Sequence, residues 1–193
     1  MRDALATFDP ATHRLPPTVV PLRGIVLIGL YTLMRPSNNL QLRWENITLH
    51  PAEDRGSFRL FKHKNADKGV LAEGALHPVL VRYLRTIQPS RHAGYVHPNS
   101  ATKKPYVNIR SQWRRLIVIA NTMLEPEERI SGRAEDMYVL RATGATLLAA
   151  TGADPVLICN MMGDAQLETI RRHYFSSHID HMQAAVNRLV IAL

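Results

Sequence analysis

The chain has 193 residues, 46% of them hydrophobic, so it is long enough for one substantial core and marginal for two domains. Its net charge of +8 indicates an anionic partner. The only cysteine, Cys159, excludes a disulfide framework, and the apolar run 24–34 is well short of the ~20 residues that span a membrane. No secretory signal is evident, so we expect the protein to work in the cytosol or on a chromosome.

The basic charge is concentrated in one segment. Residues 58–115 carry 12 Lys and Arg against only Asp67 and Glu73. Such a segment is either a solvated face or a surface that follows a phosphate backbone, and charge alone does not separate the two. In the second case, the side chains that would contact the phosphates of a nucleic acid are those of Lys62, Lys64, Lys68, Lys103, Lys104, Arg110, Arg114 and Arg115.

The first half of the chain predicts a helix followed by a β-hairpin. Residues 1–17 contain Asp9-Pro10 and Pro16-Pro17 and are interpreted as a linker or irregular arm, so that 18–193 forms one domain with no separate N-terminal domain. A helix is predicted over 19–34 and is ended or bent by Pro36. Residues 40–49 predict a short helix that turns into a strand.

Alternating apolar residues predict strands over 57–62 and 70–76. The turn formers of 65–69 join them, so three lysines lie around the tip of a hairpin. A helix over 78–87, a loop over 88–105 and a helix over 108–123 follow. Trp44 and Trp113 are interpreted as packing residues.

The last third predicts three helices. The first runs over 138–150 and ends near Gly152, and the second begins with the N-cap Asp154 and Pro155 and ends at Gly163. The third carries Leu167, Ile170 and Tyr174. The expected fold class is therefore mainly α with a small antiparallel β-sheet (α+β).

Arg35, Arg141 and Tyr174 are the residues that suggest chemistry. The sequence offers no metal-ligand cluster and no glycine-rich phosphate loop, so a covalent tyrosine mechanism is one of few routes open to it. Two guanidinium groups can each hold phosphate oxygens through a planar fork, and their charge is fixed at any working pH. That property suits a pentavalent phosphorane with extra negative charge.

Four segments, in this order, carry a family resemblance. Thr32-Leu33-Met34-Arg35, followed by Leu40-Gln41-Leu42-Arg43-Trp44, resembles the first arginine motif of the tyrosine recombinase, or phage integrase, family, a T-G-L-R core followed by L-x-L-x-W. Tyr138-Val139-Leu140-Arg141 is similar to its H-x-L-R box. Met162-Gly163-Asp164 stands where L-G-H or L-G-W is usual, and Tyr174 occupies the place of the nucleophile. The resemblance covers roughly residues 19–180.

The resemblance implies a role for each matching residue. Tyr174 would attack the phosphodiester to give a 3′-phosphotyrosyl link, while Arg35 and Arg141 stabilise the transition state. A hairpin lysine would protonate the departing 5′ oxygen, and Lys64 is the best match, with Lys62 and Lys68 as competitors. The mechanism implies no metal or other cofactor. The expected fold is that of the family's catalytic domain.

Three positions depart from the family pattern. Tyr138 replaces a histidine that helps to deprotonate the nucleophile, and a phenol with a pKa of ~10 is a poorer base near neutral pH, although it can still donate a hydrogen bond to phosphate. Asp164 replaces a histidine or tryptophan, and the N-cap of the following helix is an equally good interpretation of it. Asn38 stands in place of a glutamate.

The hypothesis is a site-specific DNA recombinase or integrase domain that binds duplex DNA and self-associates as a tetramer. The catalytic candidates are Arg35, Lys64, Tyr138, Arg141, Asp164 and Tyr174. The alternative is a DNA-binding protein of the same fold whose cutting is impaired by the departures at Tyr138, Asp164 and Asn38. A basic RNA-associated protein is a third hypothesis, which leaves the ordered motifs unexplained.

Overall fold

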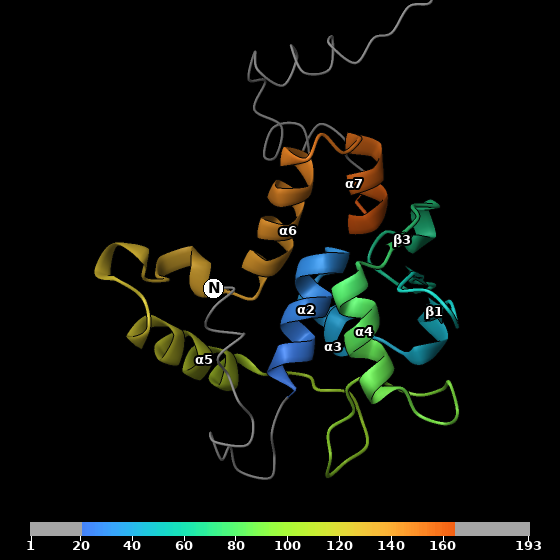
Figure 1. Cartoon of the computed structure of the whole chain (residues 1–193), viewed down its shortest axis with the longest axis horizontal. Helices are drawn as coiled ribbons and strands as arrows, with labels where there is room; N and C mark the ends of the chain where they lie inside the picture. Colours follow the sequence, from blue (N-terminus) through green and yellow to red (C-terminus); the bar gives the residue numbers. More distant parts are fainter. Residues whose placement is uncertain (1–20, 165–193) are drawn as a thin grey trace, which may run out of the picture.

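The computed structural model describes residues 21–164, which are mainly helical with one small sheet (Figure 1). This architecture confirms the expected α+β class. The predicted third C-terminal helix and the arm 1–17 lie outside the described residues. The elements are α2 (Leu22–Thr32), α3 (Pro36–Leu40), β1 (Ile47–Leu49), β2 (Gly56–Arg59), β3 (Glu73–Ala75), α4 (Pro78–Ile87), α5 (Arg110–Thr122), α6 (Tyr138–Ala150) and α7 (Pro155–Met162), with 3-10 turns at 44–46, 66–68, 126–128 and 132–135.

Helices α2 and α6 pack closely at the centre of the molecule (Figure 1). Their contact depends on Gly144 of α6, where a Cβ atom would lie 2.2 Å from the carbonyl oxygen of Leu30 and 2.5 Å from the Leu33 side chain. Because a backbone carbonyl cannot move aside cheaply, only glycine permits this approach. The main core spreads from here and includes Trp44, which is buried as predicted.

The sheet has strand order β1-β2-β3, and both pairings are antiparallel. The predicted hairpin is confirmed, with Ser57 opposite Ala75 and Phe58 opposite Gly74. Its strands are shorter than predicted because the chain leaves the ladder after the amide of Leu60 bonds the carbonyl of Ala72. The loop between these two residues turns instead toward the end of α7, beside β3 (Figure 1).

Helix boundaries were predicted well where a cap residue marks them. Helices α4 and α6 occupy the predicted ranges, and the side chain of Asp154 caps α7 by accepting a hydrogen bond from the amide of Val156. The prediction that Pro36 ends the first helix was wrong. Helix α2 already ends at Thr32, and Pro36 begins α3, where its missing N–H costs nothing.

Between residues 21 and 164, no helix is long and apolar enough to cross a membrane. Trp113 is also buried as predicted, and its indole N–H donates to the carbonyl of Glu135. Cys159 is buried in the main core.

The contact of buried His97 with half-buried Tyr83 predicts a pH-dependent stability. The Tyr83 hydroxyl lies 2.8 Å from Nε2 of His97, and burial lowers the pKa of His97 to about 4. Between pH ~6.5 and ~4 the unfolded chain therefore binds a proton that the folded chain does not, so the free energy of unfolding falls as pH falls, by on the order of 3 kcal/mol in total. Urea unfolding of His97→Gln across this range should show a shallower pH dependence than wild type.

The same exchange at the exposed His50, His50→Gln, is the matched control. If the free energy of unfolding depended on pH equally in wild type and in His97→Gln, the lowered pKa of His97 would be contradicted.

Candidate active site

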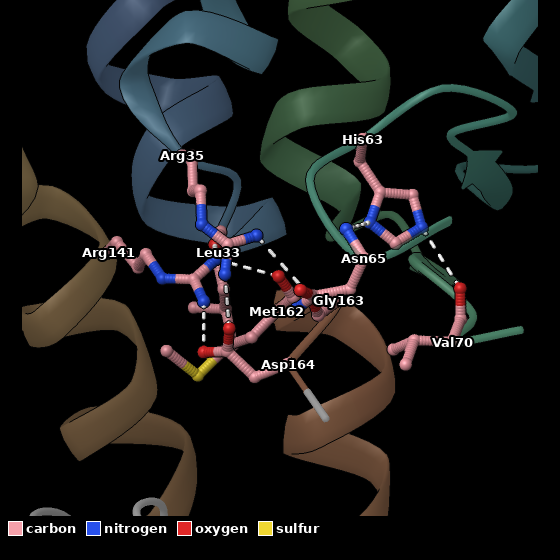
Figure 2. A network of polar contacts seen from close by, with 9 residues as sticks. All are labelled: Leu33, Arg35, His63, Asn65, Val70, Arg141, Met162, Gly163 and Asp164. Carbon is pink, nitrogen blue, oxygen red and sulfur yellow. Dashed lines mark hydrogen bonds and ion pairs between the residues drawn. The ribbon is translucent and has the colours of Figure 1, made fainter. Parts of the chain in front are cut away.

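Arg35 and Arg141 converge on one carboxylate, that of Asp164 (Figure 2). Nη2 of Arg35 pairs with Oδ1 of Asp164, and Nη2 of Arg141 pairs with Oδ2 of the same side chain. The three residues are far apart in sequence and come from three elements: the start of α3, the middle of α6 and the end of α7. The fold therefore brings the two arginines together around one carboxylate.

A strained turn places Arg35. Leu33 ends α2 in the left-handed conformation, with φ 59°, at the position where the T-G-L-R motif has glycine. A residue with a Cβ pays roughly 1–2 kcal/mol for this conformation. Burial of its side chain against Gly144 offsets that cost. The turn directs the carbonyl of Leu33 toward Arg141 and brings Arg35 to the N-cap of α3.

The Arg141 side chain is buried, with 6% exposure. Its Nη1 donates to the carbonyls of Leu33, at 2.6 Å, and Met162, at 2.8 Å. These carbonyls lie at the C-terminal ends of α2 and α7, where helices leave acceptors unpaired and carry partial negative charge. The guanidinium group thus binds the C-terminal ends of two helices through Nη1 and the Asp164 carboxylate through Nη2.

The cap of α7 places Asp164. Gly163 is left-handed, with φ 61°, and the amides of Gly163 and Asp164 bond the carbonyls of Asn160 and Cys159. The Asp164 side chain then faces both arginines with 24% exposure. The alternative that Asp164 caps the next helix concerns residues outside the described part of the chain.

The β2–β3 hairpin loop reaches the same place (Figure 2). Nδ2 of Asn65 donates to the carbonyl of Gly163 at 2.9 Å, and Nη1 of Arg35 points to the same oxygen at 3.4 Å. His63 lies beside Asn65. Sequence reasoning missed both residues, because Asn65 was seen only as a turn former and nothing in the sequence links it to Gly163.

The three hairpin lysines are exposed. Lys62 and Lys64 precede Asn65, and Lys68 ends the short 3-10 turn of the loop. None of them forms an ion pair with an acidic residue between 21 and 164. The general-acid assignment to Lys64 stays a prediction, but the loop that carries Lys64 contacts the carbonyl next to the arginine pair.

Tyr138 lies one helical turn before Arg141 on α6, and among residues 21–164 no hydrogen bond joins its side chain to the arginine network. It is half exposed at the start of α6, and its hydroxyl has no hydrogen-bond partner among residues 21–164. Its ring lines a groove of about 610 Å³ together with Arg110 and Arg114 of α5 and Pro36 of α3. The structure thus puts Tyr138 in one groove with two predicted DNA contacts.

The other predicted DNA contacts are also exposed cations. Arg115 lies on α5, and Lys103 and Lys104 lie on a closed loop, in which the amide of Lys103 bonds the carbonyl of Asn99 at 2.8 Å. Lys103 itself has φ 58°. Within the described range 21–164, no carboxylate neutralises any of these side chains. They remain available to an anionic partner.

The site combines two positive charges with one negative charge and can hold a small oxyanion between its guanidinium groups. Among residues 21–164, no group of three or more His, Cys, Asp or Glu side chains is placed to bind a metal ion. Tyr174, the predicted nucleophile, lies outside the described residues.

No family model and no curated protein matches the sequence. Solved structures do match the fold. Helices and sheet superpose on the Tn1549 transposon integrase in complex with circular intermediate DNA, with TM-score 0.70 and 15% identity over 98% of this chain. The XerH site-specific recombinase bound to its difH substrate gives TM-score 0.59 at 17% identity over 96% of this chain. The XerA recombinase gives 0.60 at 15% identity over 98%.

This chain spans 50% of the XerH chain, 63% of the XerA chain and 65% of the integrase chain. At these identities the likeness establishes the fold, which is that of the tyrosine recombinase catalytic domain. The fold expected from the sequence motifs is thereby confirmed.

Proposed function

We propose that this chain is the catalytic part of a site-specific DNA recombinase or integrase that cuts and rejoins DNA through a 3′-phosphotyrosyl intermediate. The observation that carries the proposal is the convergence of Arg35 and Arg141 on one carboxylate. Two fixed cations around one small anion, in a fold shared with recombinases seen on DNA, support phosphodiester chemistry.

The Asp164 carboxylate stands in for two non-bridging oxygens of the scissile phosphate. Its two oxygens each meet a different guanidinium group, which is the contact that a phosphate needs from two planar forks. When DNA enters, the phosphate takes over these contacts and Asp164 turns aside. The carboxylate thus keeps the arginines arranged in the absence of DNA, at the cost of competing with the substrate.

In the chemical step the Tyr174 oxygen attacks phosphorus and its proton passes to solvent. The bond from phosphorus to the 5′ oxygen breaks, and Lys64 protonates that oxygen as it leaves. Arg35 and Arg141 offset the negative charge that builds up on the phosphorane. Attack by a 5′ hydroxyl on the phosphotyrosine reverses the step and joins the strands. Tyr138, in its groove, contributes a hydrogen bond to the DNA backbone rather than base catalysis.

Duplex DNA is the partner, held through the exposed cations of the hairpin loop, the loop at 99–104 and α5. The absence of carboxylate partners among residues 21–164 supports phosphate contacts for these side chains, because an unpaired cation releases counterions when it meets DNA. Copies of the chain self-associate as a tetramer on DNA, and the protein acts at the nucleoid.

Covalent trapping tests the proposal. A nicked DNA substrate, from which the short strand downstream of the cut diffuses away, should leave wild type attached to DNA as a slower band on a denaturing gel. Tyr174→Phe should bind the same DNA and give no such band. The reaction should proceed in EDTA, because two guanidinium groups provide the charge that metal ions provide in other phosphoryl-transfer sites.

Wild type that binds duplex DNA without attaching to any substrate would favour the non-cutting alternative. Covalent attachment of Tyr174→Phe to DNA would show that Tyr174 is not the nucleophile. A strict requirement for a divalent metal would contradict the arginine-based mechanism.

A further inference from the structure

One backbone oxygen joins the arginine site to the lysine-bearing loop. The carbonyl of Gly163 accepts a hydrogen bond from the side-chain amide of Asn65 at 2.9 Å and faces Nη1 of Arg35 at 3.4 Å (Figure 2). Asn65 follows Lys64 directly in the chain. The position of Lys64 is therefore tied to the group that also contacts Arg35.

The loop around Asn65 is internally bonded. Nδ1 of His63 lies 3.4 Å from the Asn65 amide nitrogen, and Nε2 of His63 lies 3.0 Å from the carbonyl of Val70 (Figure 2). If Nδ1 accepts from the amide, Nε2 carries the proton and donates, so a neutral ring satisfies both contacts. The carbonyl of Asn65 also accepts from the amide of Lys68 at 3.1 Å. These hydrogen bonds hold the loop together, and the Asn65 side chain bonds it to the end of α7.

The end of α7 fits against this loop closely. A Cβ atom on Gly163 would lie 2.8 Å from Cβ of Ala72 and 3.2 Å from Nδ1 of His63. On β3, a Cβ atom on Gly74 would lie 2.6 Å from the Met161 side chain. Hairpin and helix end therefore pack together at Gly163 and at Met161, and the Asn65 hydrogen bond adds a polar contact between them.

We propose that Asn65 is a positioning residue that holds the hairpin loop, and with it Lys64, at the arginine site during proton transfer to the leaving 5′ oxygen. The inference rests on the proposed function. Asn65 contacts neither the reacting atoms nor DNA; it acts through the loop. Its loss should therefore slow the one step that needs a placed acid and leave the arginine and tyrosine contributions intact.

A substrate with sulfur in place of the bridging 5′ oxygen isolates that step, because a thiolate leaves without protonation. With the ordinary oxygen substrate, Asn65→Ala should slow covalent attachment by roughly 10- to 100-fold, since a small misplacement of a catalytic group has effects of that size. With the sulfur substrate, the rate of covalent attachment by Asn65→Ala should be within about threefold of the wild-type rate. Lys64→Ala should follow the same pattern, and Asn65→Asp, which keeps the shape but lacks the donor, should behave like Asn65→Ala.

Asn46→Ala is the matched control, because Asn46 donates to the carbonyl of Arg59 in the same sheet at 2.8 Å but does not reach Gly163. It should show wild-type rates on both substrates. Equal slowing of Asn65→Ala on oxygen and sulfur substrates, or no slowing on either, would overturn the proposal. Failure of wild type to attach to either substrate would instead reject the proposed function itself.

Discussion

Replacing Arg141 with lysine should slow covalent attachment to DNA by about 10²- to 10³-fold, the loss typical when one preorganised donor to a developing oxyanion is removed. Lysine keeps the charge, but it lacks the planar fork that contacts Leu33, Met162 and Asp164 at the same time. Binding of duplex DNA should change only a few fold, because many exposed cations share it. Single-turnover trapping and fluorescence anisotropy measure the two quantities.

Arg43→Lys is the matched control, because Arg43 is exposed, paired with Glu45 and stacked over Tyr95, away from the site. It should retain wild-type attachment. Arg35→Lys provides a second test at a less buried position and should lose activity in the same way. Wild-type rates of covalent attachment in both Arg141→Lys and Arg35→Lys would show that the two arginines take no part in the reaction.

Replacing Asp164 with asparagine should move activity and stability in opposite directions. Without the competing carboxylate, covalent attachment at low DNA concentration should rise, by roughly 10-fold if one charged hydrogen bond is no longer displaced. The free energy of unfolding should fall by about 1–3 kcal/mol, because two partly buried guanidinium groups lose their partner. Trapping at subsaturating DNA and urea unfolding measure the two effects.

Asp154→Asn, at the other end of the same helix, controls for the loss of a carboxylate, since asparagine caps a helix about as well. Asp154→Asn should leave both covalent attachment and the free energy of unfolding close to their wild-type values. A fall in attachment with Asp164→Asn would assign the carboxylate a direct part in the reaction and contradict its role as a stand-in for phosphate.

The sequence predicted the parts of this site that are marked by local chemistry. Arg35 and Arg141 were identified because their motifs are ordered along the chain, and α6 and α7 were bounded by Gly152, Asp154 and Gly163. These signals depend on residues a few positions apart. The fold class followed from the same local patterns, because helical and strand periods differ clearly.

The contacts across the site could not be predicted in this way. Whether Asp164 points back at the arginines or forward to cap a helix depends on where three distant elements meet. The left-handed conformation of Leu33 could not be predicted, because leucine disfavours it. The packing of Leu33 against Gly144, which offsets the cost, joins residues far apart in the sequence. The bond from Asn65 to Gly163 likewise joins residues with no pattern in common.

The most direct test of the central claim is to identify the residue that becomes attached to DNA. Trypsin should release residues 173–188 as one peptide, bounded by Arg172 and Arg188, in which Tyr174 is the only tyrosine. Mass spectrometry of the trapped complex should find this peptide carrying a 3′-phosphorylated nucleotide on Tyr174. A nucleotide attached at any other residue, or through its 5′ phosphate, would contradict the account.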